Sequence, residues 1–195
     1  MDLLNKVKIV SQKVLYSGWS TLSEFWIDYR FENGQIIRLR REIYNSGDGA
    51  AILLYNEVDK KLLLVRQYRL AAVTNGDETG FLIECCAGML DNSFPEKAII
   101  KEVEEETGYR LQSVTKIGEV YATPGAHMEK IHLYVGRYDE TMKISSGGGN
   151  MEEFEEIEIV QPTYDEVKLW LDNGAIKDAK TMILLQYGLI KGFIK

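Results

Sequence analysis

One stretch of the chain, residues 80–109, constrains the fold more than any other. It reads GFLIECCAGMLDNSFPEKAIIKEVEEETGY, which predicts a strand, a tight loop and an acidic helix. Ser93 and Glu96 have the spacing of a capping box, whose side chains bond free backbone N–H groups at a helix start. Pro95 suits the first turn because its missing N–H has no helical partner there. Gly108 is expected to end the helix in a left-handed conformation. The apolar stripe predicted to be buried consists of Ala98, Ile99 and Val103.

The acidic residues of this helix are unusually dense. Four carboxylates fall within five positions, and three of them share one face at i,i+3 and i,i+4 spacing: Glu102, Glu105 and Glu106. Like charges at this spacing cost about 0.2–0.5 kcal/mol per pair. The helix dipole disfavours anions in the last turns by about 0.3–1 kcal/mol each. A bound Mg²⁺ or Mn²⁺ would make the clustered carboxylates favourable instead of unfavourable, because both ions prefer oxygen ligands. The alternative is an acidic face that is only solvated.

Length and composition limit the classes of function. With 195 residues, 45% of them hydrophobic, the chain is expected to form one main domain with a small appendage. A net charge of −7 argues against nucleic acid as the main ligand. The first residues lack the pattern of a secretory signal, and no apolar run is long enough for a membrane span. The adjacent Cys85 and Cys86 are expected to be buried, unpaired thiols in a reducing cytoplasm.

The remaining pattern divides the chain at residue 45. Residues 1–45 are predicted to be antiparallel strands, with an Asn33-Gly34 pair that suits a type I′ hairpin turn. The third strand carries Arg38, Arg40 and Arg41, which are either a charged sheet edge or a phosphate clamp. Residues 46–195 alternate strands and helices, with a second capping box predicted at Thr163 and a last helix over residues 178–189. Residues 145–150, which include three consecutive glycines, are expected to be flexible.

Several of these residues together resemble a known family. Gly88, Lys101-Glu102-Val103, Glu105-Glu106 and Gly108-Tyr109 resemble the motif of the nudix hydrolases, a Gly followed by R-E-apolar-x-E-E-x-G. Residues 84–88 resemble the E-x-x-A-G of members that act on nucleoside diphosphate sugars. The chain departs from the motif in three ways: Lys replaces Arg at position 101, an acid is missing near Ser93, and Gly88 lies one residue late. The resemblance implies an α/β/α sandwich with a mixed sheet, joined to an N-terminal antiparallel β appendage.

The resemblance also implies an activity. It is closest to the GDP-mannose pyrophosphatases of the family, which implies metal-dependent hydrolysis of GDP-mannose to GMP and mannose 1-phosphate. ADP-ribose is the alternative substrate, and a nudix-fold sensor that binds a nucleotide sugar without cleaving it is the third possibility. The expected cofactor is Mg²⁺, or else Mn²⁺. The expected assembly is a homodimer in which the N-terminal strands of one copy contribute to the site of the other.

The same resemblance assigns site residues. It implies catalytic roles for Glu102, Glu105, Glu106 and Glu155, and metal ligation by the Ala87 carbonyl, Glu102, Glu106 and Glu155. The register of the last acid leaves Glu153 as an alternative to Glu155. Arg69 matches an R-Q-x-R segment and Lys180 a D-x-K-T segment. Trp19 is either a base-stacking residue or a core or interface residue. The complete set implied to bind substrate is Trp19, Arg40, Arg41, Glu42, Arg69, Ala87, Gly88, Glu129 and Lys180.

Overall fold

The computed structural model describes residues 6–150 and 155–195 and separates into two compact units. Unit 1 consists of the described part of Met1–Asp48 together with Tyr121–Lys130. Unit 2 consists of Gly49–Val120 and Ile131–Lys195. The sequence had placed the boundary at residue 45 and had not joined the later loop to the first unit. The loop belongs there because the Tyr44 N–H donates to the Ala126 carbonyl at 2.8 Å and the Met128 N–H donates to the Tyr44 carbonyl at 2.9 Å.

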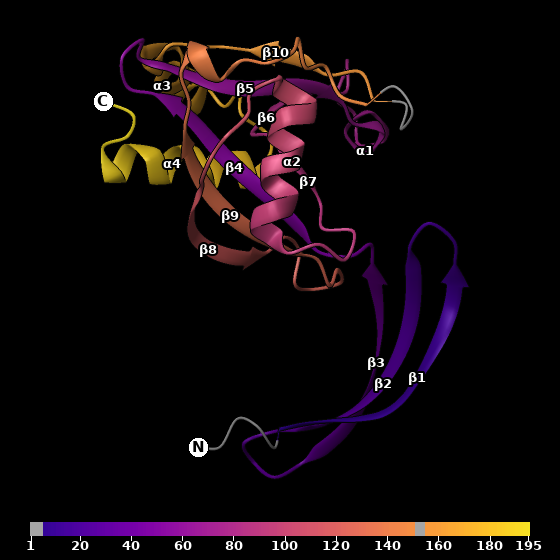
Figure 1. The fold of residues 1–195 in the computed structure, drawn as a ribbon. Helices are drawn as coiled ribbons and strands as arrows, with labels where there is room; N and C mark the ends of the chain where they lie inside the picture. Colours follow the sequence, from indigo (N-terminus) through magenta and orange to yellow (C-terminus); the bar gives the residue numbers. More distant parts are fainter. Residues whose placement is uncertain (1–5, 151–154) are drawn as a thin grey trace. The chain divides into compact units, whose positions relative to one another are not determined.

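Unit 1 is built on a three-stranded antiparallel sheet in the order β1-β2-β3 (Figure 1). Its strands are β1 (Val7–Ser17), β2 (Thr21–Arg30) and β3 (Ile36–Asn45). The predicted hairpin between β2 and β3 is confirmed, but the predicted type I′ turn is wrong. The Phe31 N–H donates to the Gln35 carbonyl at 2.8 Å, and only Gly34 of this loop has a positive φ, of 84°. A three-residue loop closes in this way, with one left-handed glycine at its end.

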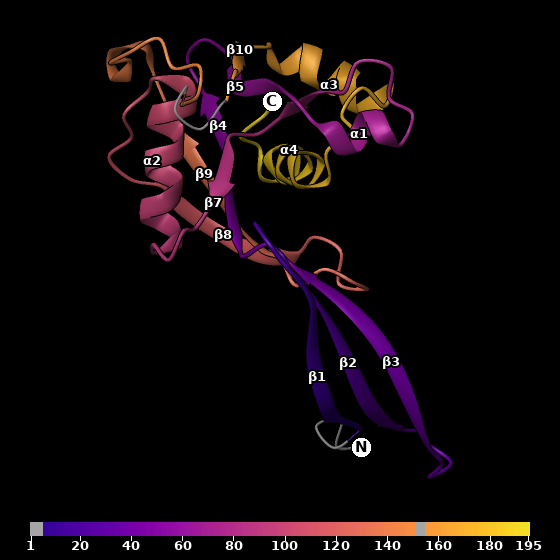
Figure 2. The same ribbon diagram turned by 90° about the vertical axis from the view of Figure 1, so that its right-hand side faces the viewer.

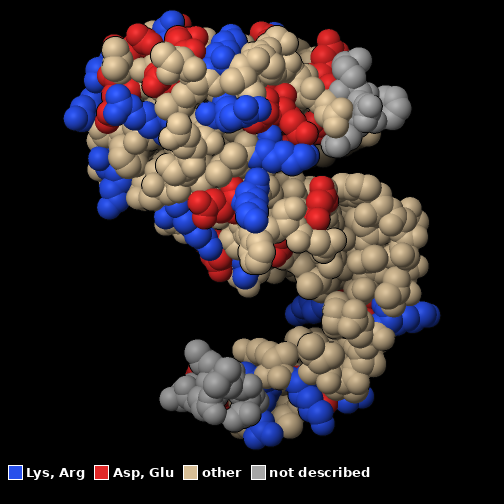
Figure 3. Space-filling view, viewed as in Figure 1, with Lys and Arg blue, Asp and Glu red and all other residues tan. Residues whose placement is uncertain are grey.

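The sheet of unit 1 is exposed on both faces. Ile36 and Ile37 are neighbours on β3, where the pairing with β2 is regular, and therefore point to opposite faces, yet they are 53% and 37% exposed. Val14 and Leu15 on β1 are exposed as well. Figure 3 shows broad uncharged areas, drawn in tan, on the visible side of this sheet. Within the described residues, unit 1 by itself therefore has no second layer that covers its apolar side chains.

Unit 2 contains a mixed sheet, which confirms the predicted fold class. Its described strands run in the order β10-β5-β4-β9-β8, with β6 paired to β5 and β7 paired to β4. The pairing of β4 with β9 is parallel, whereas β4 pairs antiparallel with β5 and β7. The strands are β4 (Gly49–Asn56), β5 (Lys61–Tyr68), β6 (Phe81–Glu84), β7 (Ala87–Met89), β8 (Thr115–Tyr121), β9 (Lys130–Arg137) and β10 (Glu158–Val160). The helices are α1 (Leu70–Thr74), α2 (Pro95–Thr107), α3 (Tyr164–Asp172) and α4 (Ala179–Lys191), with a 3-10 turn at Glu140–Met142.

Helices cover both faces of this sheet (Figure 2). One core packs Ile99 and Val103 of α2 against the sheet, and the other packs Val167 of α3 and Leu184 of α4 against it. Cys85 and Cys86, in the link between β6 and β7, belong to opposite cores, and both are buried free thiols as predicted. None of the described helices is long and apolar enough to cross a membrane.

The start of α2 differs from the sequence prediction. The N-cap is Phe94, and no side chain caps the helix, so the predicted capping box of Ser93 and Glu96 is wrong. The reason is Pro95, which occupies the first helical position and holds the preceding residue in an extended conformation, with φ −65° and ψ 134°. The helix therefore begins one residue later than a Ser93 cap requires. The C-terminal prediction is confirmed, since Gly108 has a φ of 76°.

Candidate functional site

The β7 strand and the α2 helix meet at a glycine. A Cβ on Gly88 would lie 2.5 Å from Oε1 of Glu102, closer than any side chain allows. The absence of a side chain at Gly88 therefore creates the space in which the Glu102 carboxylate lies against the strand. One residue earlier, the Ala87 N–H donates to Oε2 of Glu106 at 3.3 Å. Thus β7 brings the backbone of Ala87 and Gly88 to the two acids of α2 that the sequence had singled out.

Glu106 is a buried carboxyl group, with only 2% of its surface exposed. The pKa of Glu106 is raised to about 8, mainly by burial and also by the negative charges of Glu102 and Glu155. The Cys86 thiol and the Ala87 N–H partly oppose this shift by hydrogen bonding. The structure therefore places the charges of Glu102 and Glu155 near enough to Glu106 to disfavour its ionised form.

These groups fit a hard divalent cation by their chemistry. The donors at hand are the carboxylates of Glu102, Glu106 and Glu155 and the carbonyl of Ala87, and Mg²⁺ and Mn²⁺ prefer oxygen ligands. A cation among them would replace repulsion between like charges with attraction. Across residues 6–150 and 155–195, however, no three acidic, His or Cys side chains stand close enough together to form a complete ligand cluster. Glu153, the alternative to Glu155, lies outside the described residues.

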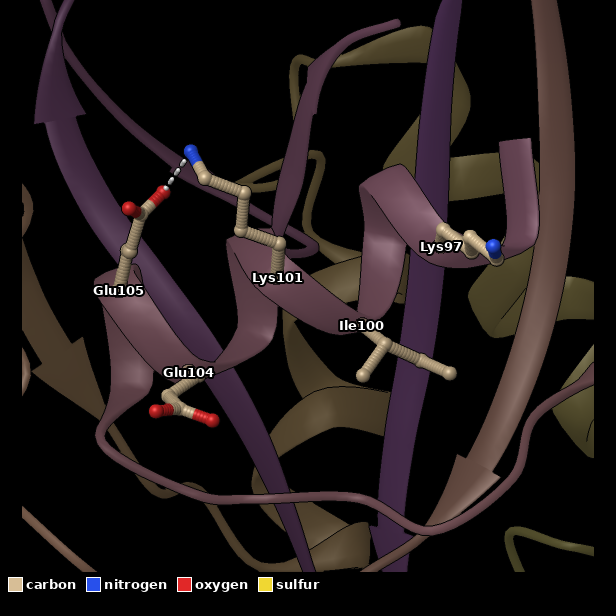
Figure 4. Close-up of a pocket in the computed structure, with 5 residues that line it drawn as sticks. All are labelled: Lys97, Ile100, Lys101, Glu104 and Glu105. Atoms are coloured by element: carbon tan, nitrogen blue, oxygen red, sulfur yellow. Dashed lines mark hydrogen bonds and ion pairs between the residues drawn. The ribbon is translucent and has the colours of Figure 1, made fainter. Parts of the chain in front are cut away.

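Glu105 lies in different surroundings from Glu106. Its Oε2 forms an ion pair with Nζ of Lys101 at 2.7 Å on the outer surface of α2 (Figure 4). The pair borders an open hollow of about 340 Å³ lined by Lys97, Ile100, Lys101, Glu104 and Glu105. Lys101, the residue that replaces the motif arginine, thus pairs with an acid. The structure holds the Glu105 carboxylate at this ion pair and does not bring it to Glu106.

The glycine run after residue 146 packs against the end of α2. A Cβ on Gly147 would lie 2.7 Å from the Glu106 carbonyl oxygen, and the Gly149 N–H donates to the Glu105 carbonyl at 3.2 Å. At the end of this run, the Asn150 carbonyl accepts from the Glu155 N–H at 3.2 Å. The flexible segment expected from the glycines is therefore held by backbone contacts.

A second cluster of charges joins β6 to α4. Nε and Nη2 of Arg69 donate to the two oxygens of Glu84 at 2.6 and 2.8 Å. Nζ of Lys180 donates to Glu84 at 2.5 Å and to Asp178 at 2.9 Å. Burial favours the neutral form of Glu84, yet hydrogen bonding by Arg69 and the charge of Lys180 hold its pKa below the usual value. The structure thus brings Arg69 and Lys180 together, which the sequence had only named separately.

Sequence reasoning had quoted Glu84 only as the first residue of a motif and had given it no role. The one available signal was an acid at the end of an otherwise apolar strand. Its partners lie 15 and 96 residues away along the chain, so no local pattern identified them. Glu84 is therefore the residue of this cluster that sequence reasoning missed.

The other predicted residues belong to unit 1. Trp19 is 77% exposed and so is not a core residue. Arg40 forms ion pairs with Glu24 and, at 2.6 Å, with Glu42. Two further residues have local contacts within the unit: Arg41 donates to the Arg40 carbonyl at 2.8 Å, and Glu129 lies 3.6 Å from Nδ1 of His127. Within unit 1 these side chains are thus held by their own neighbours or exposed.

Comparison with known proteins gives consistent matches. Residues 45–184 match the family described as NUDIX domain, and residues 6–44 match the family described as GDP-mannose pyrophosphatase NudK N-terminal domain. A protein of Pectobacterium atrosepticum named GDP-mannose pyrophosphatase is 41% identical over 187 residues, which cover 96% of each chain. A protein of the same name from Salmonella paratyphi B is 43% identical over 181 residues, covering 93% of this chain and 94% of the relative.

A solved structure shows the same fold. It is titled as the crystal structure of an ADP compounds hydrolase and superposes with a TM-score of 0.70. The superposition covers 97% of this chain and 96% of the other, at 18% sequence identity. At that identity the likeness concerns the fold alone.

Proposed function

The chain belongs to the NUDIX family, and from this premise we propose that it hydrolyses GDP-mannose to GMP and mannose 1-phosphate. Two observations from comparison support this substrate: the match of residues 6–44 and the name carried by relatives more than 40% identical over nearly the full length. The structural observation that carries the proposal is the buried Glu106 carboxyl group beside Glu102 and the Ala87 backbone.

The proposed reaction separates two phosphoryl groups that both carry negative charge. Nudix hydrolases use divalent cations, here proposed as Mg²⁺ or Mn²⁺, to neutralise such charge and to activate water. Glu102, Glu106 and the Ala87 carbonyl are the proposed ligands, with Glu155 accepting the proton of the attacking water. Glu105 supports this face of α2 through its ion pair with Lys101. Arg69 and Lys180 supply positive charge to the substrate diphosphate.

The proposed assembly is a homodimer formed through unit 1. The apolar side chains on both faces of its sheet have no second layer within the described part of the unit, and a second copy of the chain is the occupant we propose. In that dimer, five residues of unit 1 serve nucleotide-sugar binding, some of them at the site of the partner copy: Trp19, Arg40, Arg41, Glu42 and Glu129. Gly88 contacts substrate in the site of its own chain.

We also propose a cytoplasmic location for the enzyme. Cys85 and Cys86 are free and buried, and compartments that keep thiols reduced favour such unpaired cysteines. Fractionation of cells that express a tagged chain tests this location.

A product assay tests the proposed function. The purified protein is incubated with Mg²⁺ and a panel of nucleoside diphosphate sugars, and the products are identified. Release of GMP and mannose 1-phosphate is expected, and preferential release of AMP and ribose 5-phosphate from ADP-ribose would assign the other substrate. Glu106→Gln is the inactive reference, and Glu104→Gln is the matched active control on the same helix. Tight binding of GDP-mannose without turnover would replace the enzyme with a sensor.

A further inference from the structure

Glu84 is a buried carboxylate that the proposed chemistry leaves without a role. It ends β6 and is only 1% exposed. Both of its oxygens are used: Oε1 accepts from Arg69, and Oε2 accepts from Arg69 and Lys180. A buried carboxylate is tolerated only when it is paired and hydrogen-bonded, so this side chain depends on its two cations as much as they depend on it.

Glu84 also determines where the two cations lie. Nη2 of Arg69 and Nζ of Lys180 each lie within 2.8 Å of the same oxygen, Oε2. Two positive groups this close repel each other unless an anion lies between them. The Glu84 carboxylate is that anion, and its position fixes both nitrogens relative to β6.

The two cations keep donors for a further anion. A guanidinium has five N–H donors, and the Glu84 fork uses one on Nε and one on Nη2 of Arg69. Among the described residues, Nη1 of Arg69 makes no hydrogen bond, and 41% of the side chain is exposed. Lys180 is 14% exposed and places two of its three donors on Glu84 and Asp178. The edge of the guanidinium that faces away from Glu84 is thus available to a second oxyanion.

We propose that Glu84 is a positioning residue that holds Arg69 and Lys180 side by side as one binding site for the diphosphate of the substrate. The proposal rests on the proposed function, because it concerns how that substrate is held. Glu84 touches neither the substrate nor the reacting atoms. Its effect comes through the direction of the Arg69 fork and the closeness of the Lys180 ammonium. A merely structural Glu84 would influence the amount of folded protein but not its affinity for substrate.

Steady-state kinetics of Glu84→Gln test this role. The amide is nearly isosteric but carries no charge, so Arg69 loses its carboxylate partner and Lys180 keeps only its ion pair with Asp178. KM for GDP-mannose is expected to rise about 10–100-fold, with a much smaller change in kcat, because the donors that bind the diphosphate are no longer held in position. The matched control is Glu104→Gln, which breaks another two-bond pair, with Arg110 at 2.8 and 2.9 Å on the outer side of α2. This control is expected to leave KM unchanged.

A double-mutant cycle tests whether Glu84 acts through Arg69. The combined Glu84→Gln and Arg69→Gln variant is expected to raise KM by clearly less than the product of the two single effects, because both changes remove the same fork. If Glu84→Gln does not fold, Glu84→Asp takes its place. It keeps the charge on a shorter side chain, and its KM is expected to rise because the fork no longer meets the carboxylate.

The outcomes separate this inference from the proposed function. An active native enzyme whose KM stays the same in folded Glu84→Gln, or in Glu84→Asp, overturns the positioning role and leaves the function standing. Effects of Glu84→Gln and Arg69→Gln that multiply independently also overturn it. A folded native protein that turns over no nucleoside diphosphate sugar overturns the proposed function itself, and the positioning role with it.

Discussion

The N–H of Gly148 donates a 2.9 Å hydrogen bond to the carbonyl oxygen of Glu106, the residue whose side chain is the buried carboxyl group of the candidate site. The last carbonyls of a helix have no partner within the helix and need one from outside. Here the glycine segment supplies that partner, because its backbone lies directly against the end of α2. The neighbouring Asn150 carbonyl accepts a hydrogen bond from the Glu155 N–H, so backbone hydrogen bonds connect the end of α2, the glycine segment and Glu155.

Replacing Gly147 by Ala is expected to disturb this contact. The residue has a φ of +63°, and a Cβ would lie 2.5 Å from the Thr107 carbonyl carbon. We expect a loss of about 1–3 kcal/mol in the free energy of unfolding and a lower kcat, because the segment that carries Glu155 moves away from α2. Gly174→Ala is the control, since Gly174 has a φ of +75° with nothing within 4 Å of the added Cβ. Equal losses of kcat in the two variants would contradict the expectation that the contact of Gly147 with α2 positions Glu155.

Divalent metal is expected to stabilise the protein through Glu106. A ligand that binds only the folded state raises the free energy of unfolding by about 2.7 kcal/mol at a hundred times its Kd. Thermal melting of chelator-treated protein, with and without added Mg²⁺, measures this shift. Glu106→Gln is expected to lose the shift and to lower kcat by more than about 100-fold, since even residues that only support metal ligands account for 10–100-fold. A full metal-induced shift in Glu106→Gln would remove this residue from the metal site.

Acid is expected to destabilise the protein through Glu84. Arg69 and Lys180 hold the pKa of Glu84 below its ordinary value of about 4.3, so the unfolded state binds more protons than the folded state. This contribution to stability is fully present above the unfolded-state pKa and is lost as the pH falls through the lower folded-state pKa. The free energy of unfolding of the native protein, measured with denaturant, is therefore expected to fall more steeply below about pH 5 than that of Glu84→Gln. Parallel pH profiles of the two proteins would contradict this.

A charge placed on the unit 1 sheet is expected to weaken the proposed homodimer. Val14 is 52% exposed on β1, and Val14→Lys places an ammonium among the apolar side chains of that face. Analytical ultracentrifugation is expected to show a dimer for the native chain and a shift toward monomer for the variant. Val58→Lys, at a 76% exposed position in the turn between β4 and β5, is the matched control and should remain dimeric. A monomeric native chain would refute the proposed assembly.

The structural features that depend on a local sequence pattern could be predicted from the sequence. The apolar stripe of α2, the left-handed Gly108 and the capping box of Thr163 with Glu166 are all present. The predicted capping box at Ser93 is wrong because Pro95 prefers the first helical position, so the helix begins at Pro95. The two signals that compete at the start of α2, Ser93 and Pro95, lie only two residues apart.

The parts of the site that depend on distant contacts were not predictable in this way. The sequence resembles a family whose motif names Glu102 and Glu106, but nothing in it shows that Lys180 and Arg69 meet on Glu84. The three consecutive glycines led to a prediction of flexibility, because glycine-rich composition indicates conformational freedom. Composition does not show which surface a segment packs against. Close backbone approach is the other use of glycine, and only the structure distinguishes the two.

The reactivity of the two adjacent thiols between β6 and β7 can be used to measure how often the surrounding structure opens. Cys85 and Cys86 have no exposed surface, and burial raises the pKa of both thiols above the ordinary range. An alkylating reagent reacts with accessible thiolate, so it reaches these sulfur atoms only when the cores on the two sides of the sheet open. At high reagent concentration, the rate at which each thiol of the native protein is alkylated therefore equals the rate at which the core around it opens. Equal rates for Cys85 and Cys86 are the result expected if both cores open in a single event.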